Sequence, residues 1–177
     1  MRSDAAPFLL CLGFGRIAEA LVRFLIQNPA AGWRFAGTTR SADKAAQMRA
    51  RGIVPLSLDG ALAADALAET THILLSIPPG DDGDPVWRKQ PALAAVAPRL
   101  RWTGYLSTTG VYGDLGGRWA FEWIPTQPIS TEGRRRELAE RQWLSAAQPA
   151  HIFRLPGLYG PGRSAFDRLR DGTARRI

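Results

Sequence analysis

Cysteine is nearly absent from this 177-residue sequence, in which Cys11 is the only one. A single cysteine excludes an intramolecular disulfide. Because Cys11 lies in the apolar run 8–12, we expect a buried thiol instead of a reactive one. This cysteine usage favours the reducing cytoplasm.

Long hydrophobic runs are also missing. No stretch approaches the roughly 18 apolar residues of a membrane-spanning helix, and Asp4 precedes only a short apolar segment, unlike a secretory signal. The two histidines, His72 and His151, have no cysteine or paired carboxylate at metal-ligand spacing. The sequence therefore predicts neither membrane insertion nor a metal site.

Lysine is scarce too, since Lys44 and Lys89 are the only two among 23 basic residues, and the net charge of +7 comes from arginine. Such an excess reflects either anionic ligands or a biased composition, and composition is the simpler cause. The densest basic segments, 134–136 and 170–176, lack interleaved aromatic residues. Nucleic-acid binding is therefore a minor alternative.

Apolar runs alternate along the chain with segments of helical character. Strands are predicted at 8–12, 33–39, 53–56, 72–77, 102–107 and 151–155, and helices near 17–25, 41–51, 61–69, 90–97 and 131–147. Near-continuous apolar strands separated by helices favour a parallel sheet covered on both faces. We expect an α/β domain with a doubly wound, Rossmann-type parallel sheet in three α/β/α layers.

The strongest motif is Gly13-Phe14-Gly15-Arg16-Ile17-Ala18, a GxGxxA pattern between the first strand and the first helix. Gly13 would permit the tight turn, Gly15 would let a pyrophosphate approach, and Ala18 would keep helix and strand close. The helix N-terminus would supply donors to the phosphates. We therefore expect residues 13–17 to bind a dinucleotide; a glycine turn needed only for packing is the alternative.

The end of the second strand indicates which dinucleotide is bound. An acidic residue about 20 positions beyond the glycines is typical of NAD sites, whereas an arginine there accommodates a 2′-phosphate. This sequence has Thr39-Arg40-Ser41 and no acidic residue at that strand end. NADP is therefore preferred over NAD, although Arg40 could also be a solvated residue at the start of a helix.

Two further segments resemble the extended short-chain dehydrogenase/reductases of the NAD-dependent epimerase/dehydratase type. Leu106-Ser107-Thr108-Thr109-Gly110-Val111-Tyr112-Gly113 is similar to the family's fifth-strand segment. The segment 154–162, with sequence RLPGLYGPG, is similar to the one that follows the family's sixth strand. The resemblance implies that Thr108 is a catalytic hydroxyl and that Pro156 and Gly157 lie near the nicotinamide.

The resemblance also implies that Asp59 lies near the adenine and that Ile77, Pro78 and Pro79 line the cofactor. Asp59 could equally be a turn residue beside Gly60, and the two prolines could merely end a strand.

The sequence departs from the family at its catalytic YxxxK pair, whose positions fall on Glu132 and Arg136. An ionised glutamate cannot donate a proton, and arginine is always charged, although Arg136 could still bind the cofactor. Tyr112, four residues beyond Thr108, is the candidate replacement acid/base. The tryptophans, including Trp119 and Trp123, could form a substrate wall, but packing is the expected role.

The sequence thus predicts a Rossmann domain at 1–163 and a basic segment at 164–177. Because the family's members are longer, the resemblance implies that this segment starts a C-terminal substrate lobe that is absent or truncated. An NADP-dependent oxidoreductase or epimerase acting on a small polar or sugar-nucleotide substrate is one hypothesis. A catalytically silent NADP(H) sensor or scaffold is the other. An exposed sheet edge would favour a homo-oligomer.

Overall fold

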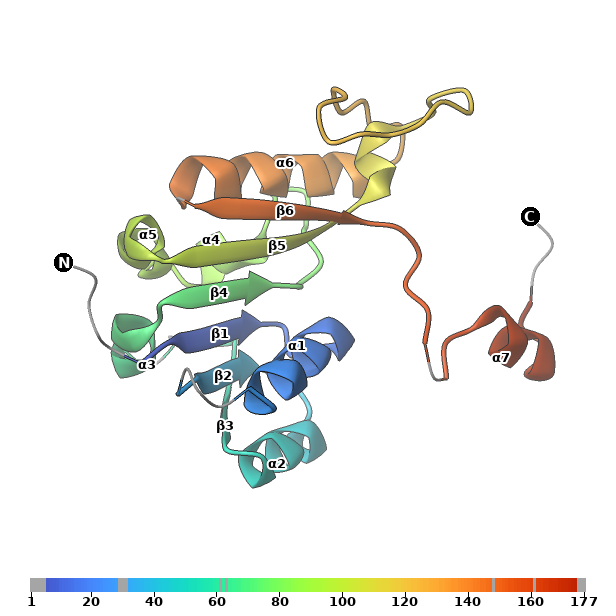
Figure 1. The fold of residues 1–177 in the computed structure, drawn as a ribbon. Helices are drawn as coiled ribbons and strands as arrows, with labels where there is room; N and C mark the ends of the chain where they lie inside the picture. The colour runs from blue at the N-terminus through green and yellow to red at the C-terminus, as the bar shows by residue number, and fades with distance from the viewer. Residues whose placement is uncertain are drawn as a thin grey trace.

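The computed structural model describes residues 6–28, 32–60, 62, 64–147, 149–160 and 162–174. Its centre is a sheet of six parallel strands in the order β3-β2-β1-β4-β5-β6 (Figure 1), which confirms the predicted doubly wound sheet. The strands are β1 (Phe8–Leu12), β2 (Arg34–Thr38), β3 (Ile53–Leu56), β4 (His72–Leu75), β5 (Trp102–Thr108) and β6 (Ala150–Leu155). The strand order reverses between β1 and β4, where doubly wound sheets bind ligands at their carboxyl ends.

Helices cover both faces of the sheet, as expected for three layers. The helices α1 (Arg16–Ile26) and α2 (Ala42–Ala50) pack on one face, against the side of β1 that carries Leu9 and Cys11. The opposite face, with Phe8, Leu10 and Leu12, packs against α3 (Ala64–Glu69), α4 (Pro85–Lys89), α5 (Leu93–Val96) and α6 (Thr131–Ala146). Alternate residues of β1 therefore build two separate cores.

The helix α1 differs from its predicted orientation at one residue. Ala18 and Val22 are buried, and Ile17, Leu21 and Leu25 pack partly against the core. Phe24, predicted on the inner face, is 62% exposed, because it lies away from the face that Val22 and Leu25 direct to the sheet.

The helix predicted at 90–97 is shorter in the structure, where α5 begins at Leu93, and a further short helix that was not predicted, α4, precedes Gln90. The side chain of Gln90 is buried and accepts a hydrogen bond from the Leu62 backbone while donating to the carbonyls of Leu58 and Gly60. The Gln90 side chain therefore holds the chain that follows β3 through three hydrogen bonds, and α5 begins three residues later, at Leu93.

The long helix α6 is anchored by a buried tryptophan. Trp143 is fully buried, packs against Trp87 at 4.2 Å between ring centroids, and donates from Nε1 to Asp84. Asp84 also caps α4 through the Val86 backbone, and burial raises the pKa of its carboxyl above the usual range. The register of α6 against the sheet is therefore fixed by packing and by a hydrogen bond.

The face of β5 and β6 next to α1 and α2 is less covered than the rest of the sheet. Trp102 lies on this face beside His151 and Phe153, and Phe153 is 40% exposed. Trp119 and Trp123 lie in the loop between β5 and α6 and are 82% and 75% exposed. The prediction that these two tryptophans pack inward is therefore wrong.

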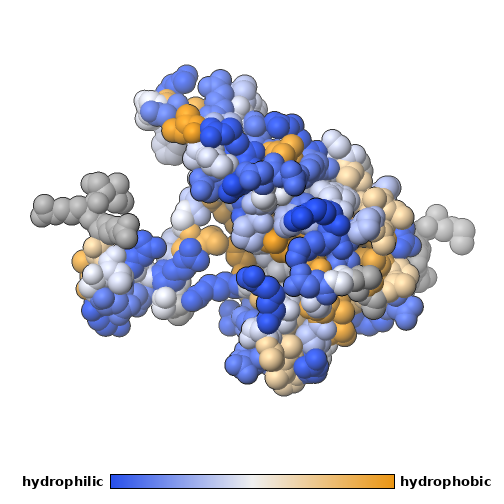
Figure 2. Space-filling model, turned by 180° about the vertical axis from the view of Figure 1, so that it is seen from behind, coloured by the Kyte–Doolittle hydropathy of each residue, from blue (hydrophilic) through white to orange (hydrophobic). Residues whose placement is uncertain are grey.

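Beyond β6 the chain leaves the sheet, and we call the segment between Leu155 and α7 (Ala165–Arg170) the arm. The sequence did not predict α7. Ser164 and Asp167 form a capping box at its start. Figures 1 and 2 show the arm and α7 standing away from the body, and Figure 2 shows a hollow between them. Among the described residues, no helix is long and apolar enough to cross a membrane.

Cys11 provides a test of the core. Its side chain is fully buried, and burial raises the pKa of its thiol to about 12. We expect no reaction with Ellman's reagent at pH 8 in the native protein and reaction of one thiol after unfolding in guanidinium chloride. Rapid labelling of the native protein would contradict the packing of β1 between its two helical layers.

Candidate functional site

The turn after β1 is held by contacts that only glycine permits. Gly13 has a φ of 92°, and a Cβ atom there would lie 2.6 Å from Ser76 Oγ. Its backbone N–H donates to Thr38 Oγ1 at 2.7 Å, and its carbonyl accepts from Ser76 Oγ at 2.6 Å. The ends of β2 and β4 therefore hold this turn from both sides.

The second glycine opens the helix to a ligand. Gly15 is the N-cap of α1, no side chain caps the helix there, and a Cβ atom at Gly15 would meet nothing within 4 Å. The first N–H groups of a helix need an acceptor, and an anion satisfies them while interacting favourably with the helix dipole. The turn therefore has the geometry of a phosphate site.

Phe14 lies differently from the expectation that it binds the cofactor. Its ring is buried in the core under α1 and α2 and lies so close to Gly37 that a Cβ atom there would be 2.6 Å from the ring. Its backbone N–H donates to the Thr38 carbonyl. Phe14 is thus a packing residue whose neighbour on β2 must be glycine.

A cleft of about 1030 Å³ opens at the carboxyl ends of the strands. One wall comes from the start of α1, another from the ends of β4 and β5, and a third from the arm after β6. Of the predicted site residues, the cleft is lined by Gly15, Arg16, Ile17, Thr108, Arg136, Pro156 and Gly157. The structure therefore gathers residues from four distant parts of the sequence around one space.

The residues after β2 lie outside this lining. Ser41 caps α2 through the Lys44 backbone, and Thr39 Oγ1 accepts from the Ser41 backbone. Arg40 is exposed. The pKa of the Asp59 carboxyl is lowered mainly by its direct ion pair with Lys89, and to a smaller extent by the charge of Arg40. Asp59 is thus an exposed, paired carboxylate.

The residues after β4 also lie mostly outside the cleft. Ile77 packs against the core, whereas Pro78 is exposed and Pro79 is half-buried. The cleft instead includes Ser76, directly after β4, whose hydroxyl holds the Gly13 turn.

A buried polar network lies beneath the cleft. Glu140 of α6 is 2% exposed and accepts a hydrogen bond from Ser107 Oγ. Arg154 of β6 donates to both carboxylate oxygens of Glu140, the shortest contact being 2.8 Å from Nη2 to Oε2. Ser107 and Arg154 are register partners on neighbouring strands, so this network joins α6, β5 and β6.

Tyr112 belongs to this network and not to the cleft lining. Its hydroxyl accepts from Arg154 Nη1 at 3.0 Å, the guanidinium lies 4.9 Å from the ring centroid, and the side chain is buried. The structure therefore places the Tyr112 ring in the interior and its hydroxyl beside Arg154, and the role of Tyr112 as an acid/base stays a prediction.

Glu132 and Arg136, to which the resemblance assigns the family's catalytic pair, lie on the first two turns of α6. Arg136 lines the cleft, and its Nη1 donates to the Leu106 carbonyl at 2.8 Å and to the Tyr105 hydroxyl at 3.2 Å. Burial raises the pKa of Tyr105 to about 12. Glu132 is exposed and is not among the residues lining the cleft.

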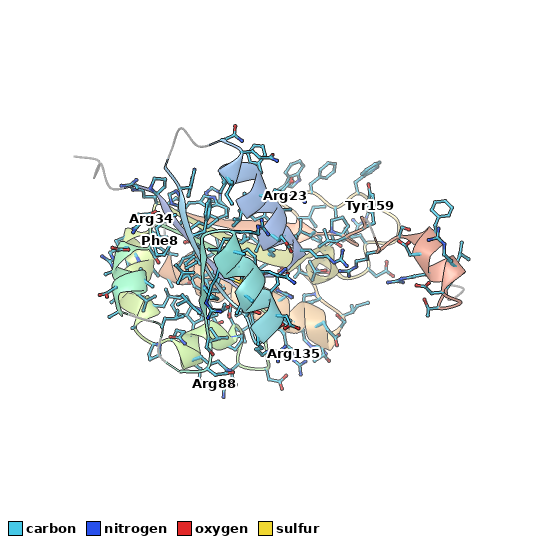
Figure 3. The ribbon with its side chains drawn as sticks, turned by 90° about the horizontal axis from the view of Figure 1, so that it is seen from below. Phe8, Arg23, Arg34, Arg88, Arg135 and Tyr159 are labelled. Carbon is cyan, nitrogen blue, oxygen red and sulfur yellow. The ribbon has the colours of Figure 1, made fainter. Side chains whose placement is uncertain are left out.

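Sequence reasoning did not single out several residues that border the cleft. They are Ser76, Ser107, Thr109, Tyr159 and Arg163, together with Glu19, Ala20 and Arg23 on α1. Figure 3 labels Arg23 on α1 and Tyr159 on the arm, two positions far apart in the sequence. The sequence signal that could have pointed to Ser76 and Thr109 is the position of a hydroxyl residue directly after a strand. Within the described part of the chain, no group of three acidic, histidine or cysteine side chains could hold a metal.

The Glu140–Arg154 pair generates a prediction about stability. Glu140→Gln leaves the half-buried guanidinium without its counter-charge, and we expect a loss of about 3 kcal/mol in the free energy of unfolding. The matched control is Glu69→Gln, which breaks the exposed Arg34–Glu69 pair, for which we expect at most about 1 kcal/mol. Urea unfolding measures both, and equal losses would contradict the role given to the buried pair.

No protein-family model and no curated protein matches the sequence. Among solved structures, a functionally unknown conserved protein from Silicibacter pomeroyi is 43% identical, with a TM-score of 0.80, and the match covers 90% of this chain and 57% of that one. UDP-glucuronic acid 4-epimerase from Bacillus cereus, in complex with NAD, is 21% identical with a TM-score of 0.68, covering 92% and 61%.

A third neighbour, dTDP-glucose 4,6-dehydratase from Bacillus anthracis in complex with NAD, is 17% identical with a TM-score of 0.69, covering 94% of this chain and 62% of that one. The chain thus spans about 57–62% of the length of these three neighbours. The structural neighbours include members of the NAD-dependent epimerase/dehydratase family, the extended short-chain dehydrogenase/reductases, and this chain has their Rossmann fold.

Proposed function

We propose that this chain binds a nicotinamide dinucleotide, NADP(H) in preference to NAD(H), and serves an oxidoreductase or epimerase acting on a hydroxyl or carbonyl of a small polar substrate. The observation that carries the proposal is the uncapped N-terminus of α1, which opens at Gly15 into the cleft that also contains Thr108. In a doubly wound sheet, this position next to the strand-order reversal is where dinucleotides bind.

The cofactor would extend along the carboxyl edge of the sheet. Its pyrophosphate would meet the backbone of residues 15–17, and its adenosine half would run towards the end of β2, where Thr39, Arg40, Ser41 and Asp59 lie. Its nicotinamide half would run towards Thr108, Arg136, Pro156 and Gly157, which line the opposite part of the cleft. The neighbouring epimerase and dehydratase carry NAD, so the preference for a 2′-phosphate depends on Arg40 of this chain.

Thr108 is the residue placed to act on a substrate. Its Oγ1 accepts a hydrogen bond from the Gly110 backbone at 3.2 Å, which orients the hydroxyl at the end of β5 and leaves its proton for a substrate oxygen. The nicotinamide, when bound, would supply or accept a hydride. Arg136 would contribute a fixed positive charge but no proton, since a guanidinium is protonated at all relevant pH values.

A catalytically silent NADP(H)-binding protein is the second candidate. The favouring observation is that Tyr159 is the one tyrosine in the cleft lining and is 89% exposed, while Tyr112 is buried against Arg154. A general acid or base must be held within hydrogen-bond reach of its substrate, and a tyrosine exposed to this extent is not held in place by packing. A sensor or scaffold would need the cofactor site alone.

Sugar nucleotides are the substrate class that the neighbours' names support, because UDP-glucuronic acid and dTDP-glucose are named for two of them. A homo-oligomer is proposed from the exposed edge of β6 and its partly uncovered face. The boundary between a cofactor domain at 1–163 and a separate C-terminal segment remains a prediction.

The cofactor proposal is tested by calorimetric titration with NADPH and NADH. Gly15→Asp places a carboxylate where the pyrophosphate would lie, and we expect binding of both nucleotides to be lost. Arg40→Ala removes a charge-assisted contact to the 2′-phosphate, and we expect NADPH to bind at least about tenfold more weakly while NADH is unchanged. Arg88→Ala, at an exposed arginine of α4 outside the cleft, is the matched control.

Each outcome of this titration has a distinct meaning. Loss of NADPH binding in Gly15→Asp and weaker NADPH binding in Arg40→Ala, with no change in Arg88→Ala, supports the proposed site. Equal NADH and NADPH affinities, with no effect of Arg40→Ala, would overturn the NADP preference alone. Failure of wild type to bind either nucleotide would overturn the cofactor proposal.

A further inference from the structure

Arg136 is immobilised on one side only. Its Nη1 donates to the Leu106 carbonyl at 2.8 Å and to the Tyr105 hydroxyl at 3.2 Å, and the guanidinium lies 5.7 Å from the Tyr105 ring centroid. These contacts come from β5, so the strand that carries Thr108 also fixes the arginine. The rotamer entropy that a free arginine would lose on binding a ligand is thereby already reduced.

The other edge of the guanidinium is unused. Nε and Nη2 make no hydrogen bond to any residue in the part of the chain that the structure describes, and the side chain lines the cleft. Two parallel N–H groups on one edge of a guanidinium match the two oxygens of a carboxylate or a phosphate. A lysine at this position would offer only a point charge.

The charges around the cleft are consistent with an anion. Its lining contains Arg16, Arg23, Arg136 and Arg163, and Glu19 is the one carboxylate in it. Glu19 is neutralised from outside the lining, because it pairs with Lys44 at 2.7 Å and with Arg51 at 3.0 Å, and these cations lower the pKa of its carboxyl. A cleft lined mainly by positive charge raises the local concentration of anions.

We infer that the cleft holds a second, anionic ligand beside the cofactor: a small substrate whose carboxylate or phosphate group is bound bidentately by Arg136, with its reacting oxygen near Thr108. The inference rests on the proposed function for the meaning of "substrate", but the anion site itself does not require the cofactor. Arg136 is accordingly a specificity-determining residue in place of the lysine of the family's catalytic pair.

The binding site is tested with malonate and inorganic phosphate as probes, titrated calorimetrically into the full chain in low-salt chloride buffer, with and without saturating NADPH. Arg136→Gln removes the guanidinium with its two parallel N–H donors, and we expect at least about tenfold weaker binding of the preferred probe. Arg136→Lys keeps the positive charge without the two parallel donors, and we expect it to restore little of the affinity for the probe. Arg141→Gln, at an exposed arginine of the same helix, is the control.

Gly15→Asp separates this site from the phosphate site of the glycine turn. Anion binding that persists in Gly15→Asp and is lost in Arg136→Gln supports the inference, whichever nucleotide result is obtained. Anion binding lost in Gly15→Asp and kept in Arg136→Gln would place the anion at α1 and overturn it. No binding of either probe to wild type would also overturn it, as would full affinity in Arg136→Lys, which would show that charge alone suffices.

Preference for malonate over phosphate would identify the substrate group as a carboxylate, and the reverse would identify a phosphate. A failed NADPH titration with an intact, Arg136-dependent anion site would refute the cofactor proposal and leave the anion site standing. Intact NADPH binding without an Arg136-dependent anion site would refute the inference about the anion and leave the cofactor proposal standing.

Discussion

The pair between Glu140 and Arg154 is the interaction on which the side of the cleft formed by β5 and β6 depends. Two charges removed from water are stable only when nearly every donor and acceptor is satisfied. Here Glu140 receives bonds from Arg154 and Ser107, and Arg154 also donates to Tyr112. Because these residues belong to α6, β5, β6 and the turn after β5, one network sets how those elements meet.

The same network decides which hydroxyls remain for a ligand. Ser107 and Thr108 are adjacent on β5, but successive residues of a strand point to opposite faces. Ser107 borders the cleft, but its hydroxyl donates to Glu140 under α6, while Thr108 lines the cleft from the neighbouring position. The Tyr112 hydroxyl accepts from Arg154, so two hydroxyls of the segment 106–113 take part in the buried network.

The fold followed from the sequence because the strands are mostly apolar, alternate with helical segments, and have GxGxxA between the first strand and helix. Side-chain direction could not be derived in the same way. Phe14 lies inside the glycine motif but packs on Gly37, and nothing local indicates that contact, which joins β1 to β2. Gln90 lies outside the helix predicted to begin at it, and its amide bonds backbone groups that precede it by about 30 residues, a contact that nothing local indicates.

The resemblance to the epimerase/dehydratase family assigns the positions of its catalytic tyrosine and lysine to Glu132 and Arg136, and this assignment stays a prediction. Reduction of a carbonyl produces an alkoxide, which a guanidinium can stabilise by its charge but cannot neutralise by giving up a proton. The cleft is bordered by the exposed Tyr159 and is therefore open to water. The guanidinium of Arg136 therefore suits stabilisation of an anion better than proton transfer.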